Sequence, residues 1–199
     1  ALMLQAGRGG SQDLAKARKL LELSVEQGIA SARGDLALMQ LNGEGGPEDI
    51  VAARRHLDFA VAEGGADVQS NLATLLYRGL GGPQDLVEAR RLCSLAAAQG
   101  LDEAQYNLAV MHDRGEGGPQ DHVEARRLFG LAAAQGHIQA QHCLAVCCRG
   151  GHGGPQDLVE ARRLFGLAAD QGNPGSQAAL ATLLYTGSGG PKDHVAARR

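Results

Sequence analysis

The chain is 199 residues long and 44% hydrophobic, a content typical of a soluble chain that buries a core, which argues against disorder. Its 19 basic and 22 acidic residues give a formal charge of −3, too balanced for a general nucleic-acid binder. No stretch approaches the roughly 18 unbroken apolar residues of a membrane span, and no charged-then-apolar leader opens the chain. We therefore expect no nucleic-acid binding, no membrane insertion and no secretion.

Proline sets the internal organisation of the chain. It recurs every 36 residues, at Pro47, Pro83, Pro119, Pro155 and Pro191. Ser11 occupies the equivalent position one period before Pro47. A fixed period of 20 to 50 residues is typical of solenoids, propellers and arrays. The sequence therefore predicts a single repeat array over 1–199, with full units at 11–46, 47–82, 83–118, 119–154 and 155–190, and partial units at 1–10 and 191–199.

The first element of a unit follows the proline, and we call it the Pro helix. In the third unit, 85–100 predicts a helix of about 14 residues, because one helical stripe collects Leu86, Ala89, Leu92, Cys93, Ala96 and Gly100. Asp85 and Glu88 have the spacing of a capping box, and Gly100 suits the helix stop. The capping pair recurs as Asp121 with Glu124 and Asp157 with Glu160. From the sequence, the aspartate either caps the helix or lies in its first turn after a proline at the first helical position.

The second element of a unit is also helical, and we call it the Tyr helix because all three tyrosines lie on it. In the third unit it covers 103–114, with Ala104, Leu108, Ala109 and Met111 apolar, and it ends at the glycine turn 115–118. No window shows the sustained period of two that strands require. One unit cannot bury both apolar faces alone, so neighbouring units must stack, and recurrent alanines let the helices approach closely. The predicted fold class is all-α, an α-solenoid.

One repeated string carries a family resemblance. Gly-Gly-Pro-Gln-Asp-x-Val-Glu-Ala-Arg-Arg-Leu-Phe-x-Leu-Ala-Ala-x-Gln-Gly, preceded by Ala-Gln-x-x-Leu-Ala, resembles the Sel1-like repeat (SLR), a relative of the tetratricopeptide repeat, over the whole chain. The chain departs from the family at its bulky aromatic pair, here Leu-Phe, Leu-Cys, His-Leu or Leu-Leu, and has Gly for the valine after the Gly-x-Gly turn. The resemblance implies a right-handed solenoid of helix-turn-helix repeats and a non-catalytic adaptor that binds proteins, with no cofactor.

The resemblance to tetratricopeptide arrays also implies a concave groove lined by unit positions 21, 24, 28, 31 and 32 of the Tyr helices. Tyrosine and arginine are enriched at binding hot spots, so these positions are the predicted site for a protein or peptide partner. In the alternative interpretation, Tyr77 and Tyr185 only fill gaps in the core. The candidate groove residues are Ser70, Thr74, Tyr77, Arg78, Tyr106, Asp113, Arg114, His142, Arg149 and Tyr185.

Paired basic residues recur at unit positions 8 and 9, as Arg90 and Arg91 in the third unit. This ladder could bind an acidic ligand. The favoured interpretation is a solvated face, balanced by Glu88 and its equivalents Glu124 and Glu160 and by contacts to neighbouring loop carbonyls.

Sulfur and imidazole groups gather in the fourth unit, where Cys143 and Cys147 share a helical face. A zinc site completed by His112 or His152, or a dyad of Cys143 with His142 or His112, is conceivable. However, no paired Cys-x-x-Cys motif and no oxyanion donor support either. We expect no metal site and no catalytic residue, and a packing role for Cys93. The cysteines do not recur with the period, as they do in disulfide-bonded relatives, which favours a reducing, cytoplasmic location. The cluster comprises His137, His142, Cys143, Cys147, Cys148 and His152.

Both ends of the sequence fall inside units, since Ala1 aligns with Ala37 and Arg199 lies nine residues into a Pro-led segment. Repeat arrays normally carry polar capping units. The expectation is therefore a piece of a longer array, or an array that associates end to end. Partner binding is the leading hypothesis, and a structural or self-associating segment of a larger protein is the alternative.

Overall fold

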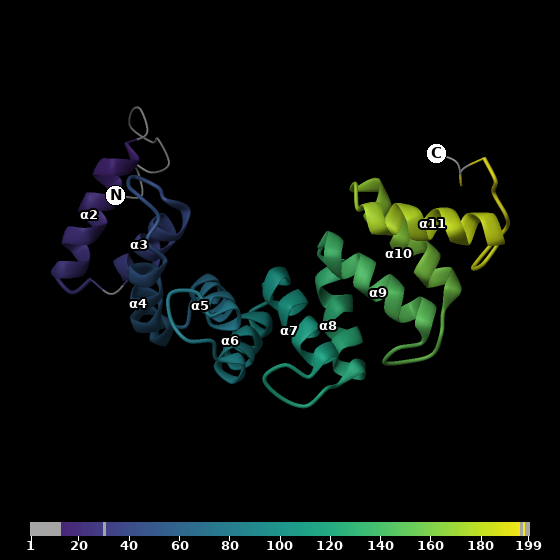
Figure 1. The fold of residues 1–199 in the computed structure, drawn as a ribbon, viewed down its shortest axis with the longest axis horizontal. Helices are drawn as coiled ribbons and strands as arrows, with labels where there is room; N and C mark the ends of the chain where they lie inside the picture. The colour runs from purple at the N-terminus through teal and green to yellow at the C-terminus, as the bar shows by residue number, and fades with distance from the viewer. Residues whose placement is uncertain (1–12, 30, 196, 198–199) are drawn as a thin grey trace. The chain divides into compact units, whose positions relative to one another are not determined.

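The structure is a computed structural model that describes residues 13–29, 31–195 and 197. Over these residues it contains ten α-helices, a short 3-10 helix and no strand, which confirms the all-α class (Figure 1). None of these helices is both long and apolar enough to cross a bilayer. The Pro helices are α2 (Leu14–Glu26), α4 (Ile50–Ala60), α6 (Leu86–Ala98), α8 (His122–Ala134) and α10 (Leu158–Asp170). The Tyr helices are α3 (Ser31–Asn42), α5 (Ala66–Arg78), α7 (Asp102–Arg114), α9 (Ile138–Gly150) and α11 (Pro174–Thr186).

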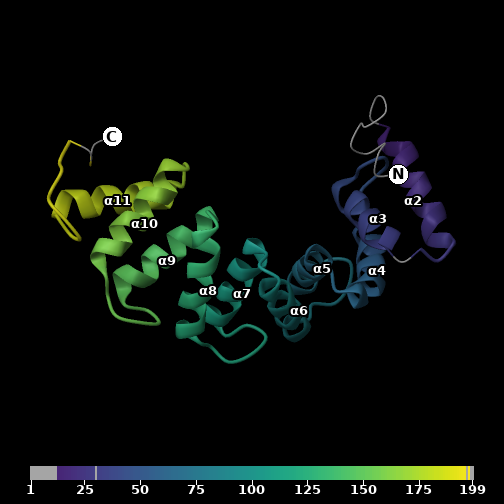
Figure 2. The ribbon, with the colours of Figure 1, turned by 180° about the vertical axis from the view of Figure 1, so that it is seen from behind.

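The helices group into two compact units, Ala1–Ala96 and Ala97–Arg199. In the first unit, α2 packs against α3, α3 against α4, and α4 against α5. In the second, each helix from α7 to α11 packs against the next in the sequence, as both ribbon views show (Figures 1 and 2). Each unit is thus a stack of helical hairpins.

Small residues build the core, as the sequence predicted. The alanine at unit position 7 of the Pro helix has no exposed surface in any of five repeats, and phenylalanine fills the remaining space in α8 and α10. Phe59 differs, because its side chain is 64% exposed. Phe59 lies two unit positions after Phe129 and Phe165, and so it faces outward from the helix.

Each Pro helix begins with the predicted aspartate cap, but the capping box is only half formed. Asp85 Oδ1 accepts from the Glu88 N–H at 2.9 Å, and the equivalent bonds recur at Asp13, Asp49, Asp121 and Asp157. The Glu88 carboxylate binds Arg91 rather than returning to the cap. The Asp85 N–H instead donates to the Leu76 carbonyl at 3.0 Å, so the cap also ties the Pro helix to the preceding Tyr helix.

The glycine turns lie directly against the start of the preceding Pro helix. Gly153 has φ +68°, a conformation that disfavours side chains, and a Cβ added there would overlap the His122 carbonyl oxygen. The turn therefore requires glycine for two separate reasons.

The arginine ladder makes the glutamate and loop-carbonyl contacts that the sequence favoured, but among the described residues only its position-9 members are exposed to solvent. At unit position 8, Arg54 is buried and donates to the carbonyls of Leu80 at 3.1 Å and Pro83 at 2.9 Å. Arg18, Arg126 and Arg162 reach the equivalent proline carbonyls. At position 9, Arg91 makes a two-pronged ion pair with Glu88, and Arg127 and Arg163 do the same with Glu124 and Glu160.

Candidate partner-binding surface

Four of the predicted groove residues are exposed, and all four lie in the last turn of a Tyr helix: Arg78, Arg114, Arg149 and Tyr185. Arg114 makes a long ion pair with Glu116, at 3.8 Å. The Arg149 guanidinium lies 5.5 Å from the Phe165 ring centre. The end of α5 in the compact unit Ala1–Ala96, and the ends of α7, α9 and α11 in the compact unit Ala97–Arg199, each present a large side chain able to contact a ligand.

Tyr106 and His142 are half-buried, and both lie at repeat-to-repeat contacts. The Tyr106 ring stacks on His137 at 4.7 Å and is tilted against Phe129 at 6.0 Å. His142 Nδ1 is 2.8 Å from the hydroxyl of fully buried Ser176. Burial, helped by Arg149, lowers the pKa of His142 below its ordinary value, so its imidazole is neutral at pH 7. The rings of Tyr106 and His142 therefore contribute to packing between repeats, in addition to any contact with a ligand.

The remaining predicted residues differ in their access to solvent. Tyr77, Thr74 and Asp113 are half-buried, and Asp113 Oδ1 is 2.8 Å from His122 Nδ1. Ser70 is buried, and its carbonyl accepts the Thr74 hydroxyl at 3.0 Å. A partner cannot reach the Ser70 side chain in this structure, so its inclusion in the groove is corrected.

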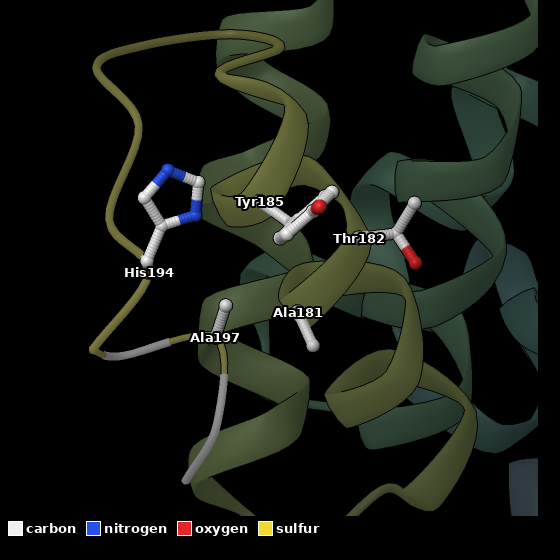
Figure 3. Close-up of a pocket in the computed structure, with 5 residues that line it drawn as sticks. All are labelled: Ala181, Thr182, Tyr185, His194 and Ala197. Carbon is white, nitrogen blue, oxygen red and sulfur yellow. The ribbon is translucent and has the colours of Figure 1, made fainter.

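Tyr185 is the most open aromatic residue of the predicted set, at 65% exposure. It borders a pocket of about 370 Å³ with Ala181 and Thr182 of α11 and with His194 and Ala197 of the following segment (Figure 3). The rings of Tyr185 and His194 meet edge to face at 5.2 Å. The equivalents of Ala181 in α7 and α9 are fully buried, whereas Ala181 is only half-buried. The face of α11 thus leaves apolar surface open beside Tyr185.

The cysteines of the fourth 36-residue repeat, 119–154, do not form a reactive site. Burial, with a smaller contribution from the Asp113 carboxylate, raises the pKa of both Cys143 and Cys147 to about 11. The thiolate is the nucleophile, so these thiols are inert at neutral pH. All four cysteines are free. Across the described part of the chain, no group of three or more His, Cys, Asp or Glu side chains is placed to hold a metal ion.

The raised thiol pKa values predict slow alkylation. A shift from 9.0 to about 11 lowers the thiolate fraction near pH 8 about 100-fold, so iodoacetamide should modify native Cys143 and Cys147 about 100 times more slowly than the urea-unfolded chain. The same shift predicts that stability falls as pH rises above 9, because the unfolded chain ionises first. Mass spectrometry of alkylated peptides checks the rates. Equal rates in the native and unfolded chains would contradict this assignment.

The sequence interpretation missed a second pocket. It lies in the compact unit Ala1–Ala96 and is bordered by α2, α3 and α4. The signal was available, because the segment 30–65 departs from the repeat pattern at several positions. Those departures have no motif spacing, and only the fold brings them together. The pocket is lined by Val25, Arg33, Ala52, Arg55, His56 and Phe59.

Comparison with known proteins identifies the repeat. The Sel1 repeat model matches residues 1–29, 30–65, 66–101, 102–137, 138–173 and 174–199. The full matches keep the 36-residue period, and each begins near a Tyr helix rather than at the proline. No curated protein matches the sequence.

Solved structures agree on the fold. A protective antigen of uropathogenic Escherichia coli with an SLR fold is 28% identical, with a TM-score of 0.90 over 99% of this chain, which spans 42% of that protein. A Sel1 repeat protein of Oxalobacter formigenes is 25% identical, with a TM-score of 0.84, covering 99% of this chain and 79% of that one. A putative Sel1 repeat protein of Klebsiella pneumoniae, at 23% identity and a TM-score of 0.56 over 88% and 85% of the two chains, shares the fold alone. The chain belongs to the Sel1 repeat family and is an all-α solenoid of helical hairpin repeats.

Proposed function

We propose that the chain is a non-catalytic scaffold that binds a protein or peptide segment through the last turns of its Tyr helices. Sel1 repeats generally mediate protein–protein interactions, and Sel1 scaffold proteins are generally non-catalytic. The observation that carries the proposal is the contrast between a buried, repeated framework and an exposed set of side chains that varies from repeat to repeat.

The contrast is sharpest at unit position 31. The successive residues there are Leu41, Tyr77, Asp113, Arg149 and Tyr185, of which Arg149 and Tyr185 are exposed, while the alanine at position 27 is the same in every repeat. Tyrosine, arginine and aspartate together supply aromatic area and charges of both signs, which are the groups that anchor protein interfaces.

An affinity test separates this surface from the rest of the chain. The variant Arg78→Ala, Arg114→Ala, Arg149→Ala and Tyr185→Ala removes exposed side chains from the Tyr helices and should retain the helix content of the wild type. The amount of each protein captured from native extract should be at least about tenfold lower with this variant than with the wild-type chain, as measured by quantitative mass spectrometry.

The matched control is Arg91→Ala, Arg127→Ala and Arg163→Ala, which removes the same number of arginines from the Pro helices. It should capture the same proteins as the wild type. Equal capture by the Tyr-helix variant and the wild type would exclude this surface as the binding site.

A second candidate, self-association, rests on the open face of α11. Ala181 is half-buried beside the Tyr185 pocket, whereas Ala109 and Ala145 at the same repeat position are fully buried. A second copy of the chain could cover this face. Sedimentation velocity over a range of concentrations should then show growth in mass that Ala181→Arg abolishes, and a mass independent of concentration would exclude it.

A further inference from the structure

The pocket bordered by α2, α3 and α4 differs in chemistry from the Tyr-helix surface. By this surface we mean the exposed residues Arg78, Arg114, Arg149 and Tyr185 in the last turns of the Tyr helices. The pocket has a volume of about 270 Å³ and combines apolar walls with three basic side chains. The apolar part comes from Val25, Ala52 and Phe59, and the basic part from Arg33, Arg55 and His56. All but Val25 belong to the one repeat at 30–65. None of the six was predicted to line the groove.

This repeat departs from its neighbours at four of the pocket positions. Where it has Arg33, the following repeats have glutamine; where it has His56 and Phe59, the other Pro helices have leucine. Ala52 stands where the next three Pro helices have glutamate. All four positions are half-buried or exposed and so lie outside the buried framework, and the four departures share one pocket. They therefore point to a site rather than to packing.

Because Ala52 replaces the glutamate of the next three Pro helices, Arg55 lacks the ion-pair partner of its equivalents. In the next three Pro helices, the equivalent arginines bind that glutamate with two hydrogen bonds of 2.6–2.8 Å. With Ala52 in its place, neither Arg55 nor Arg33 forms an ion pair with any described residue. The Arg33 guanidinium instead lies 5.1 Å from the Phe59 ring centre, which holds it by a cation–π interaction beside the pocket.

The two arginines also place positive charge beside His56 in the pocket. Burial and then the charges of Arg55 and Arg33 lower the pKa of His56, while Asp49 and Glu22 act weakly in the opposite direction. Glu22 is itself engaged by Arg18 at 3.3 Å. His56 Nδ1 lies 2.8 Å from Gln40 Oε1, which fixes the ring. An anion in the pocket would offset the positive charges of the two guanidinium groups.

We propose that this pocket binds an oxyanion, a carboxylate or a phosphate ester, carried by a side chain of a partner protein. The two guanidinium groups bind the oxyanion, and Phe59, Val25 and Ala52 contact the apolar stem of the side chain. The volume is below that of a typical small-molecule cleft and fits one side chain. The inference rests on the proposed scaffold function for the identity of the partner, but it uses residues outside the Tyr-helix surface.

The repeats themselves supply the test variants. Ala52→Glu restores the glutamate of the next three repeats, which should pair with Arg55 and neutralise the pocket without disturbing the fold. Arg33→Gln restores the glutamine of the following repeats. Arg127→Gln is the control, because it makes the charge more negative by one, as the other two do, at a site outside the pocket.

The probes are three fluorescein-labelled, end-capped peptides of one leucine-glycine scaffold, bearing glutamate, phosphoserine or glutamine. Fluorescence anisotropy should show that the wild type binds the glutamate or the phosphoserine peptide at least about tenfold more tightly than the glutamine peptide. Ala52→Glu and Arg33→Gln should each reduce that affinity about tenfold, and Arg127→Gln should change it less than about twofold. Whichever anionic peptide binds identifies the source of the oxyanion.

Two results would overturn the proposal: binding of the glutamine peptide as tight as that of both anionic peptides, or unchanged affinity of both pocket variants. The Tyr-helix variant of the capture experiment distinguishes the two proposals, since it should bind the anionic peptide as the wild type does. Retained peptide binding with no protein capture contradicts the scaffold function and leaves the pocket supported, and the reverse pattern contradicts the pocket alone.

Discussion

The Gly153→Ala variant is expected to lower the free energy of unfolding by about 2–4 kcal/mol. Part of this loss comes from placing a side chain at positive φ, and the rest from the overlap of the new Cβ with the His122 carbonyl oxygen. The carbonyl belongs to the first residue of α8 and cannot move without displacing that helix. Urea unfolding followed by circular dichroism measures the difference.

Gly130→Ala is the matched control for this prediction. Gly130 lies inside α8, its φ is not positive, and a Cβ added there meets nothing within 4 Å. Alanine is a better helix former than glycine, so this variant should be more stable than the wild type by up to about 1 kcal/mol. Similar stabilities of the two variants would contradict the claim that the Gly153 turn packs closely against the start of α8.

The Arg54→Met variant should cost about 2–3 kcal/mol of stability. Arg54 is 9% exposed, and its guanidinium donates to two loop carbonyls, at Leu80 and Pro83. Methionine keeps much of the apolar volume but leaves both carbonyls without this charged donor. Thermal and urea unfolding of the purified variant provide the measurement.

Arg91→Met is the control, since it removes an arginine from an exposed ion pair in another repeat. Exposed pairs contribute about 0–1 kcal/mol, so this variant should unfold close to the wild type. An equal loss in both variants would mean that the stability depends on net charge, not on the arginine-to-carbonyl bonds. The pair thus separates two roles within one sequence motif, Arg-Arg.

Much of the fold could be predicted from the sequence, because the contacts that determine it repeat with the period. The aspartate caps, the buried alanines and the arginine contacts to loop carbonyls each occur several times, and chance does not produce such agreement. The second half of the capping box could not be predicted. Glu88 has two possible partners at similar spacing, and the arginine side offers two charged hydrogen bonds.

The candidate site was harder to predict, because it depends on positions where the repeat varies. The pattern indicated which Tyr-helix positions vary, and four of the ten residues are exposed, but it could not separate exposed from buried members. Ser70 is small enough to be covered, and Tyr106 is held by His137, a residue of the next loop. The pocket around Arg33 and Phe59 was missed for the opposite reason. Its residues looked like ordinary substitutions until the fold placed them together.

The hydrogen bonds that link one repeat to the next join residues at nearly constant separations along the chain. Arg54 and Pro83 are 29 positions apart, as are Arg126 and Pro155, and Gln105 and Gln135 are 30 apart. Duplication or deletion of one whole 36-residue unit would keep every such separation, whereas one residue inserted in a glycine turn would displace the proline carbonyl from its arginine. The evolutionary history of this array should therefore consist of gains and losses of entire units, with the turn length held constant throughout.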